Sequence, residues 1–364
     1  MVKNMESFNN YIINMSNLRH NYLTIKSHLN NGVKLCCMVK ADAYGHGLKD
    51  VCKNLKGADF FGVASVYEAR QIRQFDKFTP VLIVGVYNHD YTLWCSQNNV
   101  SVAITSLAEL NQIISILDGS PLKIHIKINS GLNRIGINTI KELKSMLRLI
   151  KHNSNIVLEG IFTHFATKSN DVQFILKQHN QFLKYVNLVD QNKVIVHCCN
   201  SYATLLFPCF QHGMVRCGYN LYGWQRDFNI PFLPVLNISS CIVSVHKIKK
   251  GESVGYDRTF IADRNMTIGV VPIGYADGFD RRLSNNFYVL SRGKKIKVIG
   301  NICMDVFMVD LTHTDVKIGD EVILIGESGD LSITPMDYAT ALNTSPYEIL
   351  LKFDYTRFNR VIVK

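Results

Sequence analysis

Up to about Gly223, short apolar runs alternate with longer amphipathic stretches. The apolar runs cover residues 34–40, 60–65, 80–85, 100–105, 122–129, 156–164, 194–200 and 214–223. Between several of these runs, over 106–117, 139–153 and 171–189, apolar residues recur at three- and four-residue intervals, which predicts amphipathic helices. Strands that alternate with helices predict a parallel sheet with right-handed crossovers. Eight such strands favour an α/β fold, a closed (β/α)8 barrel with its active site at the C-terminal strand ends.

An open, doubly wound sheet is the structural alternative for the same alternation. In the dinucleotide-binding version of that fold, a G-x-G-x-x-G turn follows the first strand. No such turn follows any of the apolar runs. The pattern therefore favours the barrel.

The pattern of apolar and polar residues changes after the stretch QRDFNIPFLP at 225–234. From there, short β-type runs (238–248, 266–274, 287–291, 295–300, 306–311 and 321–326) alternate with turns that contain Gly and Asp. This pattern predicts a separate, mainly β domain. We place the barrel at residues 1–230 and the second domain at 231–364.

Composition is that of an ordinary globular protein. Of the 364 residues, 47% are hydrophobic, and no run reaches the ~18 apolar residues of a membrane helix. The first twenty residues contain neither a continuous apolar stretch nor a small-residue cleavage site, so we expect no secretory signal and a cytoplasmic protein. The net charge of +11 is spread along the chain without a basic tail or an RNA-binding motif, which predicts no nucleic-acid partner.

The ten cysteines show no C-x-x-C spacing and include two adjacent pairs, Cys36–Cys37 and Cys198–Cys199. In a chain without a secretory signal, this usage favours reduced, buried thiols. The stretch HCCN at 197–200 raises the question of a metal. Its three candidate ligands are consecutive, which is poor spacing for chelation, so we interpret it as strand core and expect no metal.

Polar residues follow the C-terminal ends of several predicted strands, and a closed barrel would bring them to one mouth: Lys40, Arg134, His164, Ser201, Arg216 and Gly218. Taken alone, Lys40 and each arginine would be a solvent-facing strand-end residue, His164 a core histidine and Ser201 a helix cap. Together they indicate a ligand. Ser201 opens a helix-like segment whose terminal amides suit a phosphate. A lysine that can form a Schiff base opposite a phosphate site points to pyridoxal phosphate (PLP).

One motif points to different chemistry. GESVG at 251–255 satisfies the G-x-S-x-G pattern of serine hydrolases. That nucleophile elbow requires a helix immediately afterwards, whereas turn residues and a β-type pattern follow here. We therefore interpret Ser253 as a loop serine.

The chain resembles the fold-type III alanine racemases over its whole length. The motif around Lys40, MVKADAYGHG, resembles that family's PLP-lysine motif, and eight further motifs follow in the family's order at 128–137, 162–167, 199–205, 214–223, 254–260, 272–283, 300–311 and 352–360. Nine ordered motifs across both domains are far more specific than any one of them. The resemblance implies a PLP-dependent alanine racemase.

The resemblance also assigns roles. Lys40 matches the lysine that carries PLP and acts as one catalytic base, and Tyr256 matches the second base. Positions around the phosphate are matched by Tyr44, Ser201, Gly218, Tyr219 and Tyr355. Arg216 matches the residue that faces the pyridine nitrogen, and His164 matches a member of the polar network around it.

On the substrate side, Arg134 and Met304 match positions near the carboxylate. Lys127 aligns with a lysine that is carbamylated in some members of the family. In the family, the residues that correspond to Tyr256 and Met304 reach the barrel of a partner subunit, so a homodimer with shared active sites is expected. Tyr275 is interpreted as structural.

Three other PLP-based interpretations remain. Amino-acid decarboxylases share this domain plan but resemble a pattern with an acidic residue at the place of Arg216, and they carry a cysteine motif in the second domain that is missing here. PLP-binding proteins without enzymatic activity resemble the barrel alone. Racemases that act on serine or basic amino acids stay open. We expect interconversion of L- and D-alanine, which supplies D-alanine for peptidoglycan precursors.

Overall fold

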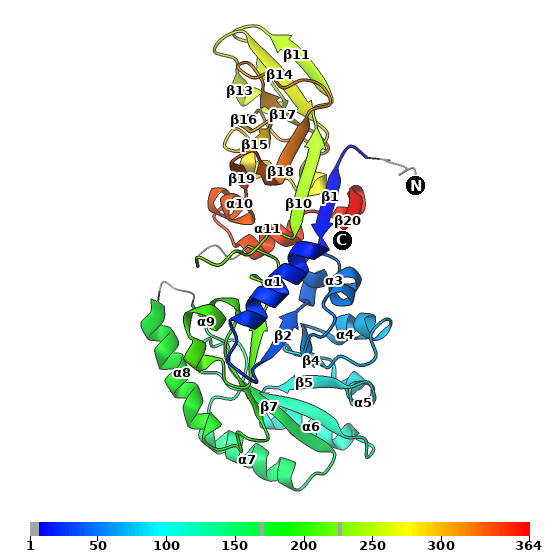
Figure 1. Cartoon of the computed structure of the whole chain (residues 1–364), viewed down its shortest axis with the longest axis vertical. Coiled ribbons are helices and arrows are strands. Elements are labelled where there is room, and N and C mark those ends of the chain that lie inside the picture. Colours follow the sequence, from blue (N-terminus) through cyan, green and yellow to red (C-terminus); the bar gives the residue numbers. More distant parts are fainter. Residues whose placement is uncertain (1–6, 168–170, 225–227) are drawn as a thin grey trace. The chain divides into compact units, whose positions relative to one another are not determined.

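The computed structural model describes residues 7–167, 171–224 and 228–364. The chain divides into two compact units, one formed by Leu18–Leu233 and the other by the N-terminal segment up to Asn17 together with Pro234–Lys364. Figure 1 shows the helices and strands of both. No helix of the described residues is both long and apolar enough to cross a membrane.

The first unit is a nearly closed barrel of eight parallel strands. These strands are β2 (Lys34–Met38), β3 (Phe60–Val63), β4 (Val81–Ile83), β5 (Val100–Ile104), β6 (Leu122–Lys127), β7 (Ile156–Phe162), β8 (Ile195–His197) and β9 (Met214–Cys217). They pair in the order β8-β7-β6-β5-β4-β3-β2-β9. Backbone hydrogen bonds from Gly213 N to Val196 O and from Arg216 N to Cys199 O, both 3.0 Å, close the ring between β8 and β9. The barrel expected from the sequence is confirmed.

Helices follow the strands and lie outside them (Figure 1). They are α3 (Leu48–Asn54), α4 (Val66–Arg73), α5 (Thr92–Gln97), α6 (Leu107–Ile116), α7 (Ile140–Lys151), α8 (Val172–Val186) and α9 (Ser201–Leu206), preceded by α1 (Met15–Ser27). The side chains of Ser65, Ser106 and Thr139 each accept a hydrogen bond from the backbone N–H three residues later, at the starts of α4, α6 and α7. These N-caps satisfy backbone donors that a helix start leaves open, and they fix where each helix begins.

The second unit is mainly β, as the sequence predicts. Its large sheet has the strand order β11-β14-β17-β16-β15-β18-β10-β1-β20, with β19 paired to β18. The strands are β1 (Asn10–Asn14), β10 (Leu236–Cys241), β11 (Ser244–Ile248), β14 (Met266–Val271), β15 (Tyr288–Ser291), β16 (Lys294–Ile299), β17 (Phe307–Asp310), β18 (Glu321–Ser328), β19 (Leu331–Ile333) and β20 (Asn359–Val363). A small hairpin, β12 (Ser253–Val254) and β13 (Phe260–Ile261), and two helices, α10 (Pro335–Leu342) and α11 (Pro346–Lys352), complete the unit.

The N-terminal strand belongs to this second unit, although the sequence analysis placed residues 1–230 in the barrel. β1 pairs antiparallel with β10 and parallel with β20. Its side chains alternate between half-buried and buried, and Tyr11 and Ile13 are fully buried. A strand with partners on both sides satisfies its backbone groups along both edges, which an isolated N-terminal segment does not.

Candidate active site

Lys40 stands at the start of an unusual turn just after β2. The next four residues, Ala41, Asp42, Ala43 and Tyr44, all have positive φ, between 49° and 56°, and Gly45 continues the turn at 81°. Most of this stretch, α2 (Lys40–Tyr44), is therefore a left-handed helical turn. Such a conformation costs L-residues roughly 1–2 kcal/mol each, and it persists only where surrounding contacts enforce it.

Contacts from the next strand and helix enforce the turn. The carboxylate of Glu68 accepts hydrogen bonds from Ala41 N at 2.6 Å and from Ala64 N at 2.7 Å, so it bridges the turn after β2 and the end of β3. Within the turn, the Asp42 carboxylate accepts from Leu48 N at 2.7 Å, at the start of α3. These anchors hold the segment that carries Lys40 at the barrel mouth.

The amine of Lys40 is half-buried in a positively charged environment. Desolvation and the nearby Arg134 guanidinium lower the pKa of Lys40, and Glu68 opposes the shift. Lys127, at the end of β6, is almost fully buried, and desolvation together with Arg134, Arg216 and Lys40 lowers its pKa to about 8. Both lysines are therefore easier to deprotonate than a lysine in water, which is the state in which an amine acts as nucleophile or base.

Arg134 is brought to these lysines by a loop that folds back on the strand it follows. After β6, Ile137 N donates to Lys127 O at 2.9 Å and Asn129 N donates to Ile137 O at 3.0 Å. Gly136 makes this closure possible, because it has a φ of +127° and an added Cβ would lie 2.9 Å from Lys127 O. The exposed Arg134 side chain thus lies close enough to influence both amines.

Arg216, on β9, is buried and has its guanidinium among neutral acceptors. It donates to the carbonyl oxygens of Thr163, His197 and Cys198 and contacts imidazole nitrogens of His197 at 2.8 Å and His164 at 3.3 Å. The Phe162 ring lies 5.2 Å from its Cζ and 5.5 Å from the Lys127 amine. Burial and Arg216 hold the pKa of His164 well below its usual range, so this imidazole is neutral.

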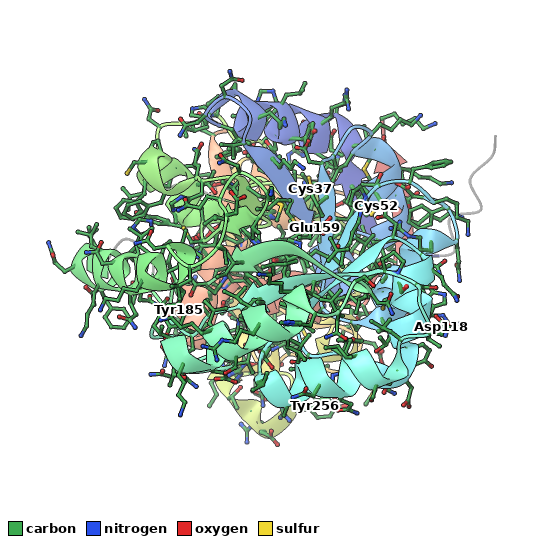
Figure 2. All side chains as sticks on the ribbon, turned by 90° about the horizontal axis from the view of Figure 1, so that it is seen from below. Cys37, Cys52, Asp118, Glu159, Tyr185 and Tyr256 are labelled. Carbon is green, nitrogen blue, oxygen red and sulfur yellow. The ribbon has the colours of Figure 1, made fainter. Side chains whose placement is uncertain are left out.

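Behind Arg216, a hydrogen-bonded relay crosses the barrel interior. His197 Nδ1 faces Arg216 Nη1, His197 Nε2 lies 2.8 Å from His125 Nδ1, and His125 Nε2 lies 3.0 Å from Glu159 Oε2. Ser101 also hydrogen-bonds this carboxylate, which lies near the middle of the ring of barrel strands in Figure 2. The sequence pattern gives no sign of His125, of Glu159 or of this function of His197, since each is an ordinary residue within an apolar strand.

Gly218 and Tyr44 meet at the other end of the candidate site. A Cβ on Gly218 would lie 2.6 Å from the Tyr44 hydroxyl, so only glycine leaves room for this approach. Gly218 N donates to Ser201 Oγ at 2.9 Å, and the adjacent Tyr219 is buried. The terminal amides of α9 differ from the expectation, since Tyr202 N and Ala203 N donate to the side chain of Asn200.

Two family models match the chain: the N-terminal domain of alanine racemase over residues 13–226 and the C-terminal domain over 235–362. The chain belongs to the alanine racemase family. It is 35% identical to an alanine racemase of Ligilactobacillus salivarius, over 93% of this chain and 94% of that protein. Among solved alanine racemases, that of E. faecalis matches with a TM-score of 0.93 at 31% identity, covering 100% of both chains. That of Bacillus anthracis with bound L-Ala-P matches with a TM-score of 0.89 at 30% identity, covering 98% of this chain and 95% of that one.

Alanine racemases are isomerases, and three of the expected site residues of this family member lie in the second unit. Tyr256 begins a 3-10 turn, η4 (Tyr256–Arg258), and its side chain is 69% exposed. Met304 is 54% exposed, whereas Tyr355, in η7 (Tyr355–Arg357), is half-buried beside Tyr11, with ring centroids 5.8 Å apart.

Backbone contacts tie Tyr256, Tyr275 and Met304 together through neighbouring loops. Asn301 donates to Tyr256 O at 3.1 Å, and Met304 O, three residues further, accepts from Ala276 N at 3.0 Å. Gly274 is needed here, because a Cβ would lie 2.1 Å from Met304 O. The three loops are therefore hydrogen-bonded neighbours, and each carries one exposed side chain, Tyr256, Tyr275 or Met304.

The G-x-S-x-G segment of this chain does not form a nucleophile elbow. Ser253 lies in β12, and Gly255 leads into the single 3-10 turn η4 where the elbow requires a helix. The Ser253 hydroxyl accepts a hydrogen bond from Arg258 at 3.3 Å. Ser253 thus supports the loop that presents Tyr256.

Proposed function

We propose that this chain interconverts L-alanine and D-alanine with PLP as its cofactor. The observation that carries the proposal is the desolvated amine of Lys40, held by a strained turn beside Arg134 and Lys127 at the barrel mouth. Arg134 lowers the pKa of Lys40, the Glu68 carboxylate opposes this shift, and the excess of cations around the amine favours an anionic ligand. Membership of the alanine racemase family supports the same conclusion.

The residues present fit a PLP group. Lys40 would bind it covalently, and Tyr44, Ser201, Gly218, Tyr219 and Tyr355 would hold its phosphate, with His164 and Arg216 around the ring. The Gly218 backbone against the Tyr44 hydroxyl is a cradle that any Cβ would fill, and this supports a phosphate end at that place. When bound, PLP supplies an electron sink that acidifies the Cα hydrogen of an amino acid.

Arg216 would set the protonation of the pyridine nitrogen. A guanidinium does not readily give up a proton, so it offers this nitrogen a hydrogen bond without protonating it. The relay through His197 and His125 to Glu159 supports this role, because its neutral rings connect the buried cation to a carboxylate. By leaving this nitrogen unprotonated, Arg216 would make PLP a weaker electron sink and so discourage side reactions.

Racemisation removes a proton from one face of Cα and returns one to the other, so we infer two bases. Lys40 would serve one face, since its lowered pKa makes the neutral amine accessible. Tyr256 would serve the other. Arg134 and the Met304 backbone would bind the substrate carboxylate and so orient the Cα hydrogen.

We infer a homodimer in which Tyr256 and Met304 complete the active site of the partner subunit. Their exposed side chains, on loops that hydrogen bonds connect, support this inference. An aromatic and a thioether side chain on one exposed surface are typical of an interface. We further propose that the enzyme acts in the cytoplasm and supplies D-alanine for peptidoglycan precursors.

The decisive test is incubation of the PLP-loaded enzyme with L-alanine in heavy water, followed by chiral separation and mass analysis. Deuterated D-alanine is the expected product, lost in Lys40→Ala and strongly reduced in Tyr256→Phe. Tyr275→Phe is the matched control, because it removes a hydroxyl from another exposed tyrosine. Deuterium in L-alanine without any D-alanine would show that Tyr256 is not the opposing base. No exchange with alanine, but exchange with serine or a basic amino acid, would move the substrate assignment to that amino acid.

A further inference from the structure

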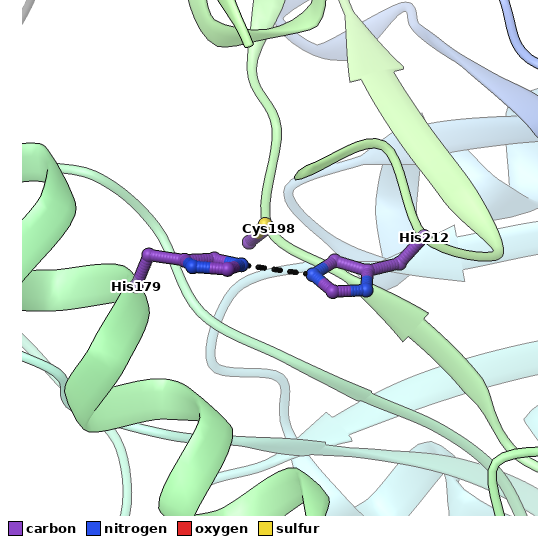
Figure 3. A group of neighbouring side chains, drawn as sticks. All are labelled: His179, Cys198 and His212. Carbon is purple, nitrogen blue, oxygen red and sulfur yellow. Dashed lines mark hydrogen bonds between the residues drawn. The ribbon is translucent and has the colours of Figure 1, made fainter. Parts of the chain in front are cut away.

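Three potential metal ligands from distant parts of the barrel unit meet beside the Arg216 network, which they join through the Cys198 carbonyl. His179 lies on α8, Cys198 follows β8, and His212 lies between the 3-10 turn η3 (Pro208–Phe210) and β9. Figure 3 shows the two imidazole rings pointing towards each other, with Cys198 beside them. The two Nε2 atoms are 3.0 Å apart, and all three ligand atoms lie within 4.8 Å of one another.

Sequence spacing did not reveal this cluster. In the HCCN stretch the neighbouring side chains point to different places: His197 faces Arg216 inside the barrel, whereas Cys198 faces His179 and His212. Only one residue of the stretch therefore takes part, and its partners come from α8 and from the loop before β9.

The side chains of this cluster are held by neighbouring residues. His179 is buried, and its imidazole lies beside that of His212, with ring centroids 5.3 Å apart. The His179 ring is held by stacking on Phe210, at a centroid distance of 3.6 Å. Cys198 is fully buried, and its thiol donates a hydrogen bond to Phe210 O at 3.2 Å, so zinc binding would require this thiol to release its proton.

We propose that His179, Cys198 and His212 form a binding site for a zinc ion. Two nitrogens on one tetrahedral zinc lie about 3.3 Å apart, given Zn–N bonds of about 2.0–2.1 Å, so the imidazoles need to separate only slightly. Neutral imidazole and thiolate are the ligands that Zn²⁺ prefers, whereas Mg²⁺ and Ca²⁺ require oxygen. Three protein ligands leave the fourth position to water, and the half-buried His212 provides access from solvent.

The site would act where the barrel closes, between β8 and β9. β8 and β9 are the two ends of the strand order, and backbone hydrogen bonds between the adjoining segments close the ring there. A zinc ion on these three side chains would tie α8, the end of β8 and the loop before β9 together. Because the unfolded chain does not hold the three ligands in place, bound zinc stabilises the folded unit.

The test uses the PLP-loaded, full-length enzyme without a histidine tag, treated with a chelator and desalted. Titration with Co²⁺ should give one equivalent of binding per chain, with thiolate-to-cobalt charge transfer and the intense visible bands of tetrahedral cobalt. Zn²⁺ should displace the cobalt and raise the melting temperature. If cobalt binds without the thiolate band, or if neither metal binds, the cluster is only a hydrogen-bonded histidine pair beside a thiol and the proposal fails.

Four variants locate the site. Cys198→Ser should remove the charge-transfer band. His212→Asn should lower the Zn²⁺ affinity by more than the ~10–100-fold that loss of an outer-shell partner costs. The controls are Cys209→Ser, at an exposed thiol, and His246→Asn, at an exposed histidine. Both should leave the charge-transfer band and the Zn²⁺ affinity unchanged. Cys198 is fully buried, whereas His212 is half-buried, so His212→Asn should disturb folding less than Cys198→Ser. Bound PLP shows whether each of these two variants is folded. Equal Zn²⁺ affinity in His212→Asn and His246→Asn would overturn the proposal.

Discussion

The carboxylate of Glu159 accepts a hydrogen bond from Nε2 of His125, at 3.0 Å. This one contact sets the direction of the relay that leads to Arg216. If His125 donates from Nε2, its Nδ1 accepts from His197 Nε2, and His197 Nδ1 is then left to accept from Arg216. Burial raises the pKa of Glu159, but the His125 hydrogen bond and other contacts outweigh it and lower the pKa to about 2, so the anchor is a carboxylate.

Glu159→Leu should therefore slow racemisation without removing any group that contacts the substrate. Without the carboxylate, His125 loses its fixed tautomer and Arg216 loses the ordered acceptor behind it. We expect kcat/KM to fall about tenfold, the equivalent of about 1.4 kcal/mol for one buried hydrogen bond. The measurement is steady-state kinetics at matched PLP occupancy.

Lys123→Gln is the matched control for Glu159→Leu. Lys123 contacts the same carboxylate at 3.5 Å, but its side chain is 42% exposed and it lies outside the relay. Its removal should change kcat/KM by less than about twofold, since exposed ion pairs contribute little. Equal losses in both variants would show that general destabilisation, and not the relay, lowers the activity.

The sequence predicted what depends on local pattern. Each apolar run of the first half became a barrel strand, because its apolar residues match a strand buried on both faces. The residues around the barrel mouth, such as Lys40 and Arg216, were found because they follow or lie on those strands. The phosphate site stays a prediction, and the amides of Tyr202 and Ala203 at the start of α9 donate instead to the side chain of Asn200.

Features that depend on closure of the fold were missed. His125 and Glu159 look like ordinary polar positions in β6 and β7, and only the pairing of these strands places His125 between Glu159 and His197. The left-handed turn after Lys40 has no glycine in its first four positive-φ residues, so backbone propensity gives no sign of it. β1 joined the second unit through partners that are more than 200 residues away in the sequence.

The left-handed turn gives a stability prediction of unusual sign. Ala41 has a φ of 51° and an exposed side chain, so Ala41→Gly relieves backbone strain without loss of buried surface. The strain relieved, less the extra chain entropy of glycine, should stabilise the fold by about 0.5–1 kcal/mol. Ala108→Gly, at an exposed position of α6, should destabilise it by about 0.8–1.0 kcal/mol. Urea unfolding of both variants measures the difference, and changes of the same sign would contradict the conformation of the turn.

Gly218→Ala should specifically weaken PLP binding. The new methyl carbon would lie 2.6 Å from the Tyr44 hydroxyl, so either Tyr44 or the backbone at the proposed phosphate end must move. We expect the PLP dissociation constant to rise at least about tenfold, since displacing one buried contact costs on the order of 1–3 kcal/mol. Gly213→Ala is the control, because its methyl group would meet only ordinary contacts of 3.5 Å or more. Absorbance titration with PLP gives both dissociation constants. Unchanged PLP binding in Gly218→Ala would show that the phosphate does not bind beside Gly218.

Lys127 should take up carbon dioxide as a carbamate, and more of it as the pH rises. Carbamylation requires the neutral amine, and the pKa of Lys127 is lowered to about 8 by burial, Arg134, Arg216 and Lys40. The neutral fraction therefore increases from roughly a tenth at pH 7 to roughly nine-tenths at pH 9.

The same surroundings favour the product of that reaction. In its protonated form, Lys127 is repelled by Arg134, Arg216 and Lys40. A carbamate on Lys127 is an anion, so the same three cations would attract it. With ¹³C-labelled carbon dioxide held at constant dissolved concentration, NMR should show one carbamate resonance that strengthens between pH 7 and pH 9. The resonance should be missing in Lys127→Met and retained in Lys123→Gln, a variant of the half-exposed lysine earlier on the same strand. A resonance that persists in Lys127→Met would belong to another amine and would leave Lys127 as a plain buried cation.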